Sequence, residues 1–216
     1  MELSEAVAAL AIFSGKDLTS TLSQIEFSIQ GRKVENCSSL FVEHHVHHEA
    51  LSAAGLVKSL AGQINVMVHA LGILLCLPEL LHPNEIVENI SLGAGNTGKK
   101  FDLETNLRVA EFKFINWQGG PEAIRQNSLF KDFYGLAEHS SHKFKYLYVL
   151  GKEVPLKFLN GRRSIESVLS KNVTLHKEFR DKYPEYKVVR DYFLPRCGHV
   201  EIEDVSLLLT GLTDFI

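Results

Sequence analysis

Residues 108–115, with the sequence RVAEFKFI, alternate apolar and polar side chains with a period of two. This alternation is typical of a β-strand whose two faces meet different surroundings. Residues 101–105 (FDLET) also have strand character, and a turn at residues 106–107 would join the two segments into an antiparallel hairpin. In that register Asp102 lies opposite Glu111.

The same register sorts the side chains of the hairpin onto two faces, because successive residues of a strand point to opposite sides. One face carries the apolar residues Leu103, Ala110, Phe112 and Phe114, and the other carries Lys100, Asp102, Glu104, Glu111 and Lys113. We expect the apolar face to pack against the protein core.

The polar face places two carboxylates, Asp102 and Glu111, directly opposite each other. Like charges in this position destabilise a sheet, with Cβ atoms about 4.5–5.5 Å apart. A divalent cation would offset the repulsion, and magnesium favours one or two carboxylates together with water and phosphate oxygens. Lys113 could then stabilise a hydroxide or a phosphate charge. The alternative is a solvated strand face on which Lys113 pairs with Glu111, and spacing alone does not separate the two interpretations.

The remaining pattern predicts an α/β core preceded by helices. We expect helices at 2–13, at 17–29 with Asp17 or a neighbour as a cap, and at 46–77 ending at Pro78; a loop at 31–39; strands at 86–92, 144–150 and 155–159; a helix from Pro121 to about Glu138; and helices at 164–171, 174–183 and 185–194. We assign residues 1–78 to a helical part packed on the core and residues 79–216 to the core with its C-terminal helices, together forming one compact domain.

The helix that follows the hairpin has an unusual apolar face. Ala123, Phe130, Phe133 and Ala137 share one side, and Gln126 lies in the middle of it. A buried polar side chain needs a hydrogen-bond partner. A core carbonyl would serve, and so would the rim of an active site.

An Asp (Asp102), a Glu-x-Lys on the next strand (Glu111 to Lys113) and a helix with an inward Gln (Gln126) resemble the PD-(D/E)xK nuclease superfamily, over about residues 80–160. The resemblance implies a restriction-endonuclease-like fold, with a mixed central sheet flanked by helices. It also implies magnesium-dependent hydrolysis of DNA, with manganese as a substitute cofactor. By this resemblance Asp102, Glu111 and the Phe112 carbonyl would bind the metal, and Lys113 would assist the attacking water.

The chain departs from that family pattern in two places. Phe101 stands where the motif carries a proline. Many members also have an acidic residue on an earlier helix, and both Glu49 and Glu79 are candidates. A fold relative that binds nucleic acid or protein without cutting it is the alternative function.

The charge distribution suggests a nucleic-acid partner despite a net charge of −3. Residues 125–196 carry 15 Lys and Arg against 8 Asp and Glu, a basic band that is compatible either with phosphate binding or with a Lys-rich solvated surface. The residues we expect to contact nucleic acid are Lys99, Lys100, Arg125, Arg162 and Arg163. The basic band does not separate DNA from RNA, and a homodimer would suit cleavage of two strands.

Two further motifs are weaker. Residues 93–99 match most of a phosphate-binding P-loop, but Lys100 occupies the Ser/Thr position and a hairpin follows in place of a helix. We therefore interpret the glycines as turn residues. A histidine cluster consists of His44, His45, His47 and His48, next to Glu49. It could bind zinc, but a solvated or helix-starting cluster is favoured because a closed zinc site needs about four ligands.

Composition favours a cytoplasmic protein. The three cysteines, Cys37, Cys76 and Cys197, form neither a disulfide framework nor a metal knuckle. The N-terminus lacks the basic region of a signal peptide. The most apolar run, residues 66–81, is interrupted by His69 and Pro78 and is short for a bilayer span. It is expected to be a buried core helix.

Overall fold

The computed structural model of the chain describes residues 1–30, 38–93, 98–115, 117, 122–209 and 212. They divide into two compact units, Met1–Asn65 and Val66–Ile216. Helices precede a five-stranded sheet that is covered by further helices. The predicted α/β class, with a mixed sheet and an N-terminal helical part, is therefore confirmed.

The first unit contains α1 (Leu3–Ser14), α2 (Leu18–Ile29), α3 (Ser38–Glu43) and the beginning of α4 (His48–Leu80). Asp17 caps α2 as expected, because its carboxylate accepts the Ser20 N–H at 2.7 Å. Helix α3 was not expected, since residues 38 and 39 were assigned to a loop. The rest of that predicted loop, residues 31–37, lies outside the described residues.

The histidine cluster lies at the beginning of α4. The His47 ring nitrogen Nδ1 accepts the Ala50 N–H at 3.2 Å, which satisfies one of the free N–H groups of the first turn. This contact agrees with the favoured interpretation of a helix-starting cluster.

Helix α4 differs from its prediction in two ways. It continues through Pro78 to Leu80, because a proline in the last turn costs one hydrogen bond without ending the helix. The run 66–81 is also buried on one face only: Ile73 and Cys76 are buried, whereas Leu71 and Leu75 are 58% and 62% exposed.

By length and composition α4 could cross a membrane, since its most apolar 18-residue window has a mean hydropathy of 1.9, and 17% of that window is buried. The core helix of a soluble protein passes the same test, so this result alone does not assign a membrane span.

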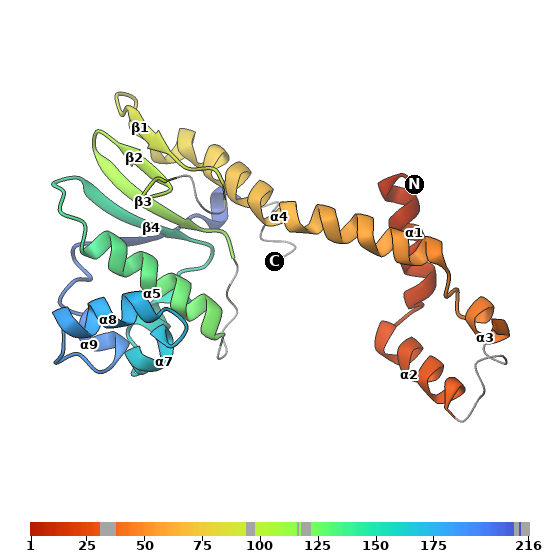
Figure 1. Cartoon of the computed structure of the whole chain (residues 1–216). Helices are drawn as coiled ribbons and strands as arrows, with labels where there is room; N and C mark the ends of the chain where they lie inside the picture. The colour runs from red at the N-terminus through yellow and green to blue at the C-terminus, as the bar shows by residue number, and fades with distance from the viewer. Residues whose placement is uncertain (31–37, 94–97, 116, 118–121, 210–211, 213–216) are drawn as a thin grey trace. The chain divides into compact units, whose positions relative to one another are not determined.

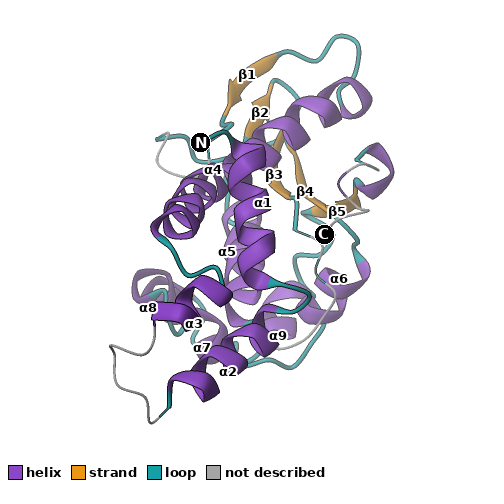
Figure 2. Ribbon diagram, turned by 90° about the vertical axis from the view of Figure 1, so that its right-hand side faces the viewer, coloured by secondary structure: helices purple, strands orange, loops and turns teal. Residues whose placement is uncertain are grey.

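The second unit is built on one sheet with strand order β1-β2-β3-β4-β5, as Figure 2 shows. Its strands are β1 (Val87–Ile90), β2 (Leu103–Thr105), β3 (Arg108–Lys113), β4 (Phe144–Val149) and β5 (Glu201–Asp204). The first three are antiparallel, and β3, β4 and β5 are parallel. The parallel pairing of β3 and β4 requires a crossover, which α5 (Ala123–Ala137) supplies.

The hairpin has the predicted register. Leu103 pairs with Ala110 and Glu104 pairs with Val109. The chain after the glycine-rich segment leads into β2 and not into a helix, which agrees with rejection of the P-loop. Gly98 has a φ of +72°, a turn conformation that suits glycine, whereas residues 94–97 lie outside the described part.

Both faces of the sheet are covered. The predicted apolar set, Leu103, Ala110, Phe112 and Phe114, packs against the C-terminal half of α4 around Ile73 and Cys76. On the other face Val109 packs with α5 and the helices beyond it (Figure 1). The polar face of the hairpin is therefore not simply solvated, because α5 covers it.

The chain after β4 contains one wrong prediction and one missed strand. Residues 155–159 were expected to form a strand but lie in α6 (Glu153–Leu159). Pro155 fits there because the first turn of a helix leaves its N–H groups unbonded. Strand β5 was not predicted, because its sequence, EIED, has one apolar residue.

The expected C-terminal helices are present as α7 (Ile165–Leu169), α8 (Val173–Lys182) and α9 (Val189–Phe193). A short 3-10 helix, η2 (Ser206–Leu208), follows β5. The predicted helix start at Pro121 lies outside the described residues.

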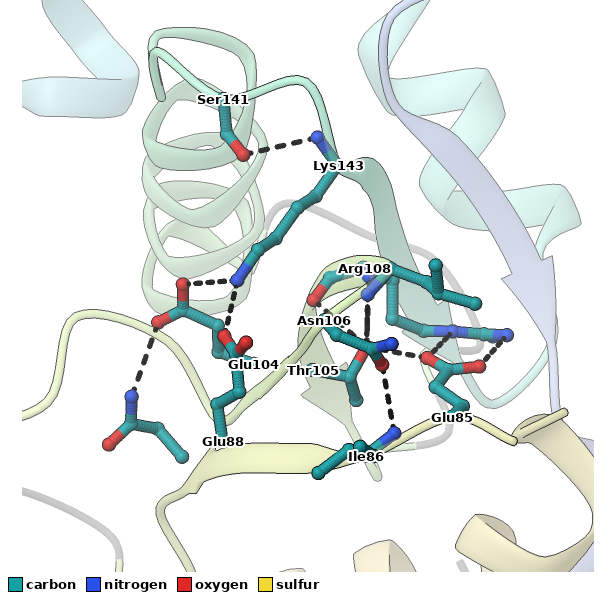
Figure 3. A network of polar contacts seen from close by, with 11 residues as sticks. Glu85, Ile86, Glu88, Glu104, Thr105, Asn106, Arg108, Ser141 and Lys143 are labelled. Atoms are coloured by element: carbon teal, nitrogen blue, oxygen red, sulfur yellow. Dashed lines mark hydrogen bonds and ion pairs between the residues drawn. The ribbon is translucent and has the colours of Figure 1, made fainter. Parts of the chain in front are cut away.

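A buried ion pair fixes the turn of the hairpin (Figure 3). The Arg108 guanidinium donates to both carboxylate oxygens of Glu85, at 2.6 and 2.7 Å, and to the Tyr148 hydroxyl at 2.9 Å. Thr105 also donates to Glu85 at 2.6 Å. Nearby, the Lys143 ammonium donates to a carboxylate oxygen of Glu104 at 2.9 Å. These contacts hold β2 and β3 in one register at the end of the hairpin opposite Asp102.

Candidate active site

Asp102 lies immediately before β2, and both of its carboxylate oxygens have partners. Oδ2 accepts the backbone N–H of Phe112 at 2.9 Å, and Oδ1 lies 3.2 Å from His69 Nε2 on α4. Burial raises the pKa of Asp102, but the hydrogen bonds from His69 and Phe112 outweigh it and hold the pKa below its usual value. Asp102 is therefore an anion in a fixed orientation.

Glu111 lies beside Asp102, but its pKa is shifted in the opposite direction, above its usual value. Burial and the charges of Asp132 and Asp102 raise its pKa to about 9, and Lys113 offsets only part of this. A hydrogen bond between the two carboxyl groups further favours the protonated form of Glu111. The surroundings of Glu111 in the metal-free site therefore favour its protonated form.

Lys113 does not form its closest ion pair with Glu111. Its ammonium lies 2.5 Å from Oδ2 of Asp132, a residue of α5. The Asp132 side chain is only 9% exposed and that of Lys113 is 26% exposed. Burial lowers the pKa of Lys113, but the negative charges of Asp132, Glu111 and Asp102 raise it above its usual value. Burial raises the pKa of Asp132 despite the attraction of Lys113.

These residues form one cluster, which we call the carboxylate cluster: Asp102, Glu111, Asp132 and Lys113, with His69 at its edge. Three carboxyl groups and one ammonium give an excess of negative charge when all are ionised. Burial and the neighbouring negative charges raise the pKa of both Glu111 and Asp132. Carboxylate oxygens are ligands that a hard divalent cation takes, and among the described residues no group of three or more Asp, Glu, His or Cys side chains is arranged to hold a metal ion.

Gln126 is buried on α5, as the helix pattern predicted. Among the described residues, its side-chain carbonyl oxygen has no hydrogen-bond donor. A buried acceptor without a partner is costly.

The basic residues that were predicted to contact nucleic acid are spread over several segments of the chain, whereas the acidic residues lie together. Lys99 donates to the Ile90 carbonyl at 2.5 Å, and Arg125 pairs with Glu122 at 2.7 Å. The Lys100 ammonium lies 3.3 Å from His139 Nδ1. The exposed residues Arg162 and Arg163 follow α6 and, within the described part of the chain, form no ion pair with the carboxylate cluster.

Sequence reasoning missed two members of the site. His69 was noted only as an interruption of an apolar run, although it is the residue of α4 that contacts Asp102. Of the two acidic candidates that the family pattern offered, Glu79 is exposed on α4 and Glu49 belongs to the first unit. Asp132 carried a signal that was not used: it is a charge on a helix face, flanked by the buried residues Leu129 and Leu136.

No family model, curated protein or solved structure matches the chain. The function is therefore inferred from the residues of the site and the strand order around them.

Proposed function

We propose that the chain is a magnesium-dependent phosphodiesterase that hydrolyses DNA. The observation that carries this proposal is the pair of half-buried carboxyl groups of Asp102 and Glu111, at one end of a hairpin whose register pairs Leu103 with Ala110. Lys113 lies two residues beyond Glu111 on the same strand.

The order of the elements supports the proposal. A helix, three antiparallel strands, a crossover helix and a parallel fourth strand follow one another from α4 to β4. This order agrees with the restriction-endonuclease-like core that the sequence resemblance implies. The acidic residues lie at the hairpin and the lysine lies at the end of β3, where that resemblance expects them.

The residues fit a magnesium ion, with manganese as a substitute. Asp102, Glu111 and the backbone carbonyl of Phe112 would hold it, since all three offer oxygen ligands. When bound, the metal supplies a Lewis acid that polarises a phosphate and lowers the pKa of water.

The protein residues prepare the site in three ways. The Phe112 N–H and His69 orient the carboxylate of Asp102. Glu111 would release its proton to water if a cation were bound in the cluster, because the repulsion that raises its pKa would then be offset. Lys113 keeps its positive charge beside Asp132, two residues beyond Glu111 on the same strand, where it would stabilise charge on a phosphate.

The substrate proposal rests on the charge outside the cluster. Lys100, Arg162 and Arg163 offer cations for a phosphate backbone, and such contacts carry no base preference. DNA is the substrate that the family resemblance implies, and RNA is tested beside it. A homodimer and a cytoplasmic location remain part of the same proposal.

A manganese titration separates the enzyme from a non-cutting binding module. We expect the wild-type protein to bind one divalent cation, and Asp102→Ala and Glu111→Ala each to weaken binding by at least 10-fold because each removes a ligand. Asp181→Ala is the matched control, since Asp181 is an exposed aspartate in α8. A wild-type protein that binds no divalent cation, with nucleic-acid binding intact, would favour the binding module.

A further inference from the structure

Asp132 is a charged residue in an apolar setting. It lies on the face of α5 that packs on the sheet, and the buried residues Leu129 and Leu136 lie one helical turn to either side. Its carboxylate is 2.5 Å from the Lys113 ammonium. No other ion pair is found for Asp132 within the described part of the chain.

This placement is costly for stability alone. Moving an aspartate out of water carries a penalty of several kcal/mol, and a buried ion pair is often no more stabilising than apolar side chains of the same volume. A leucine would suit the α5 face better. The presence of a carboxylate there therefore points to an effect on its one partner, Lys113.

Without Asp132, the Lys113 ammonium would have two other carboxyl groups in reach. Glu111 lies two residues before Lys113 on β3, and Asp102 is bonded to the main chain of the same strand at Phe112. A lysine side chain has a flexible four-carbon stem and turns readily toward a new partner. An ammonium that paired with Glu111 or Asp102 would occupy the oxygens that a metal needs.

We propose that Asp132 is a positioning residue that holds the Lys113 ammonium away from Asp102 and Glu111, so that these two carboxylates stay free for a divalent cation. This inference rests on the proposed function. Asp132 itself touches neither metal nor phosphate in this account, and its effect on the metal passes through Lys113.

The test is a double-mutant cycle of manganese affinity in the full chain, measured by calorimetry at fixed pH. The four proteins are wild type, Asp132→Asn, Lys113→Met and the double variant. In the presence of Lys113 we expect Asp132→Asn to weaken manganese binding by about 10-fold, because the freed ammonium competes for the ligands. In the Lys113→Met background the same change should alter the affinity by less than about 2-fold.

The cycle separates this role from a direct electrostatic one. If Asp132 attracted the metal through its own charge, Asp132→Asn would weaken binding equally in both backgrounds, and that result would overturn the proposal. Unchanged affinity in Asp132→Asn would also overturn it while leaving the proposed function intact. A wild-type protein that binds no manganese would instead overturn the proposed function, and this inference with it.

A second measurement needs no substitution at Asp132. The ¹⁵N signal of the Lys113 ammonium, assigned with Lys113→Arg, should report restricted motion in the metal-free wild-type protein. Lys131 is the internal reference, since it is an exposed lysine on α5, next to Asp132. Equal mobility of the two ammonium groups would contradict the proposal even if Asp132→Asn failed to fold.

Discussion

The carboxylate of Asp102 accepts the backbone N–H of Phe112, with 2.9 Å between Oδ2 and N. A side chain at the beginning of one strand thus bonds the main chain of the next, in place of a further backbone pair. The bond fixes Asp102 beside Glu111, the residue that precedes Phe112, so the carboxylate pair is a consequence of the hairpin register.

This bond predicts how Asp102→Asn will behave. Asparagine keeps an oxygen that can accept the Phe112 N–H, but it loses the charge. We expect a change in unfolding free energy of about 1 kcal/mol or less, since the hydrogen bond is retained, and at least a 10-fold loss of manganese affinity. Urea unfolding and calorimetry measure the two quantities. Unchanged manganese affinity would exclude Asp102 as a ligand.

Glu111→Gln should make the metal-free protein more stable relative to wild type as the pH rises. The pKa of Glu111 is about 9 in the folded state and 4.5 as its reference value. Because the folded value is raised, the wild-type protein loses stability as pH rises from 4.5 toward 9, and the glutamine variant does not. In EDTA, we compare the unfolding free energy of the variant with that of wild type. We expect this difference to shift in favour of the variant by about 1 kcal/mol or more from pH 5 to pH 8.

Urea unfolding at the two pH values measures this gain, and Glu166→Gln, on the exposed start of α7, is the control. A stability difference between Glu111→Gln and wild type that stays constant from pH 5 to pH 8 would argue against a protonated Glu111.

Glu138→Gln should have the opposite pH dependence. Burial raises the pKa of Glu138, but hydrogen bonds from Lys182, Tyr192 and Tyr183 lower it to about 2. The stability that these contacts give is fully present above pH 4.5 and is lost as pH falls toward 2. We expect a loss of about 1–2 kcal/mol at pH 7, with little difference from wild type near pH 2.

Glu185→Gln serves as the control for Glu138→Gln, because Glu185 is exposed. Equal effects of the two substitutions on the urea midpoint at pH 7 would show that the Glu138 contacts contribute little.

Arg108→Ala tests the ion pair that fixes the hairpin turn. The change leaves Glu85, whose side chain is 0% exposed, without its cation. Breaking a buried pair in this way costs about 3–5 kcal/mol. Arg180→Ala, at an exposed position of α8, should change the unfolding free energy by less than about 0.5 kcal/mol. Similar urea midpoints for the two variants would contradict the role of Arg108.

The hairpin could be predicted because its information is local. Alternation in residues 108–115 fixes the faces, and a short turn fixes the register, so the positions of Asp102 and Glu111 follow from sequence. The partner of Lys113 could not be predicted in this way. Asp132 comes from a different element, and only the packing of α5 on the sheet brings it to Lys113. His69 was missed for the same reason, since it reaches Asp102 from α4.

Two local patterns also misled. PLKFL at residues 155–159 has alternating apolar residues, but Pro155 fits the first turn of α6, and Phe158 and Leu159 pack on the core as helix residues. EIED in β5 has too few apolar residues to suggest a strand. It is held instead by parallel pairing with β4, a long-range contact that has no local signature.

The most direct test of the central claim is cleavage itself. Purified full-length wild-type protein is incubated with plasmid DNA, with single- and double-stranded oligonucleotides and with RNA, in magnesium, in manganese and in EDTA. Lys113→Ala, Glu111→Ala and the exposed-site control Asp181→Ala are run in parallel. We predict metal-dependent cleavage of DNA by wild type and by Asp181→Ala, and loss of cleavage in the two site variants. Equal cleavage by wild type and Glu111→Ala, or no cleavage of any substrate by wild type in either metal, would contradict the account.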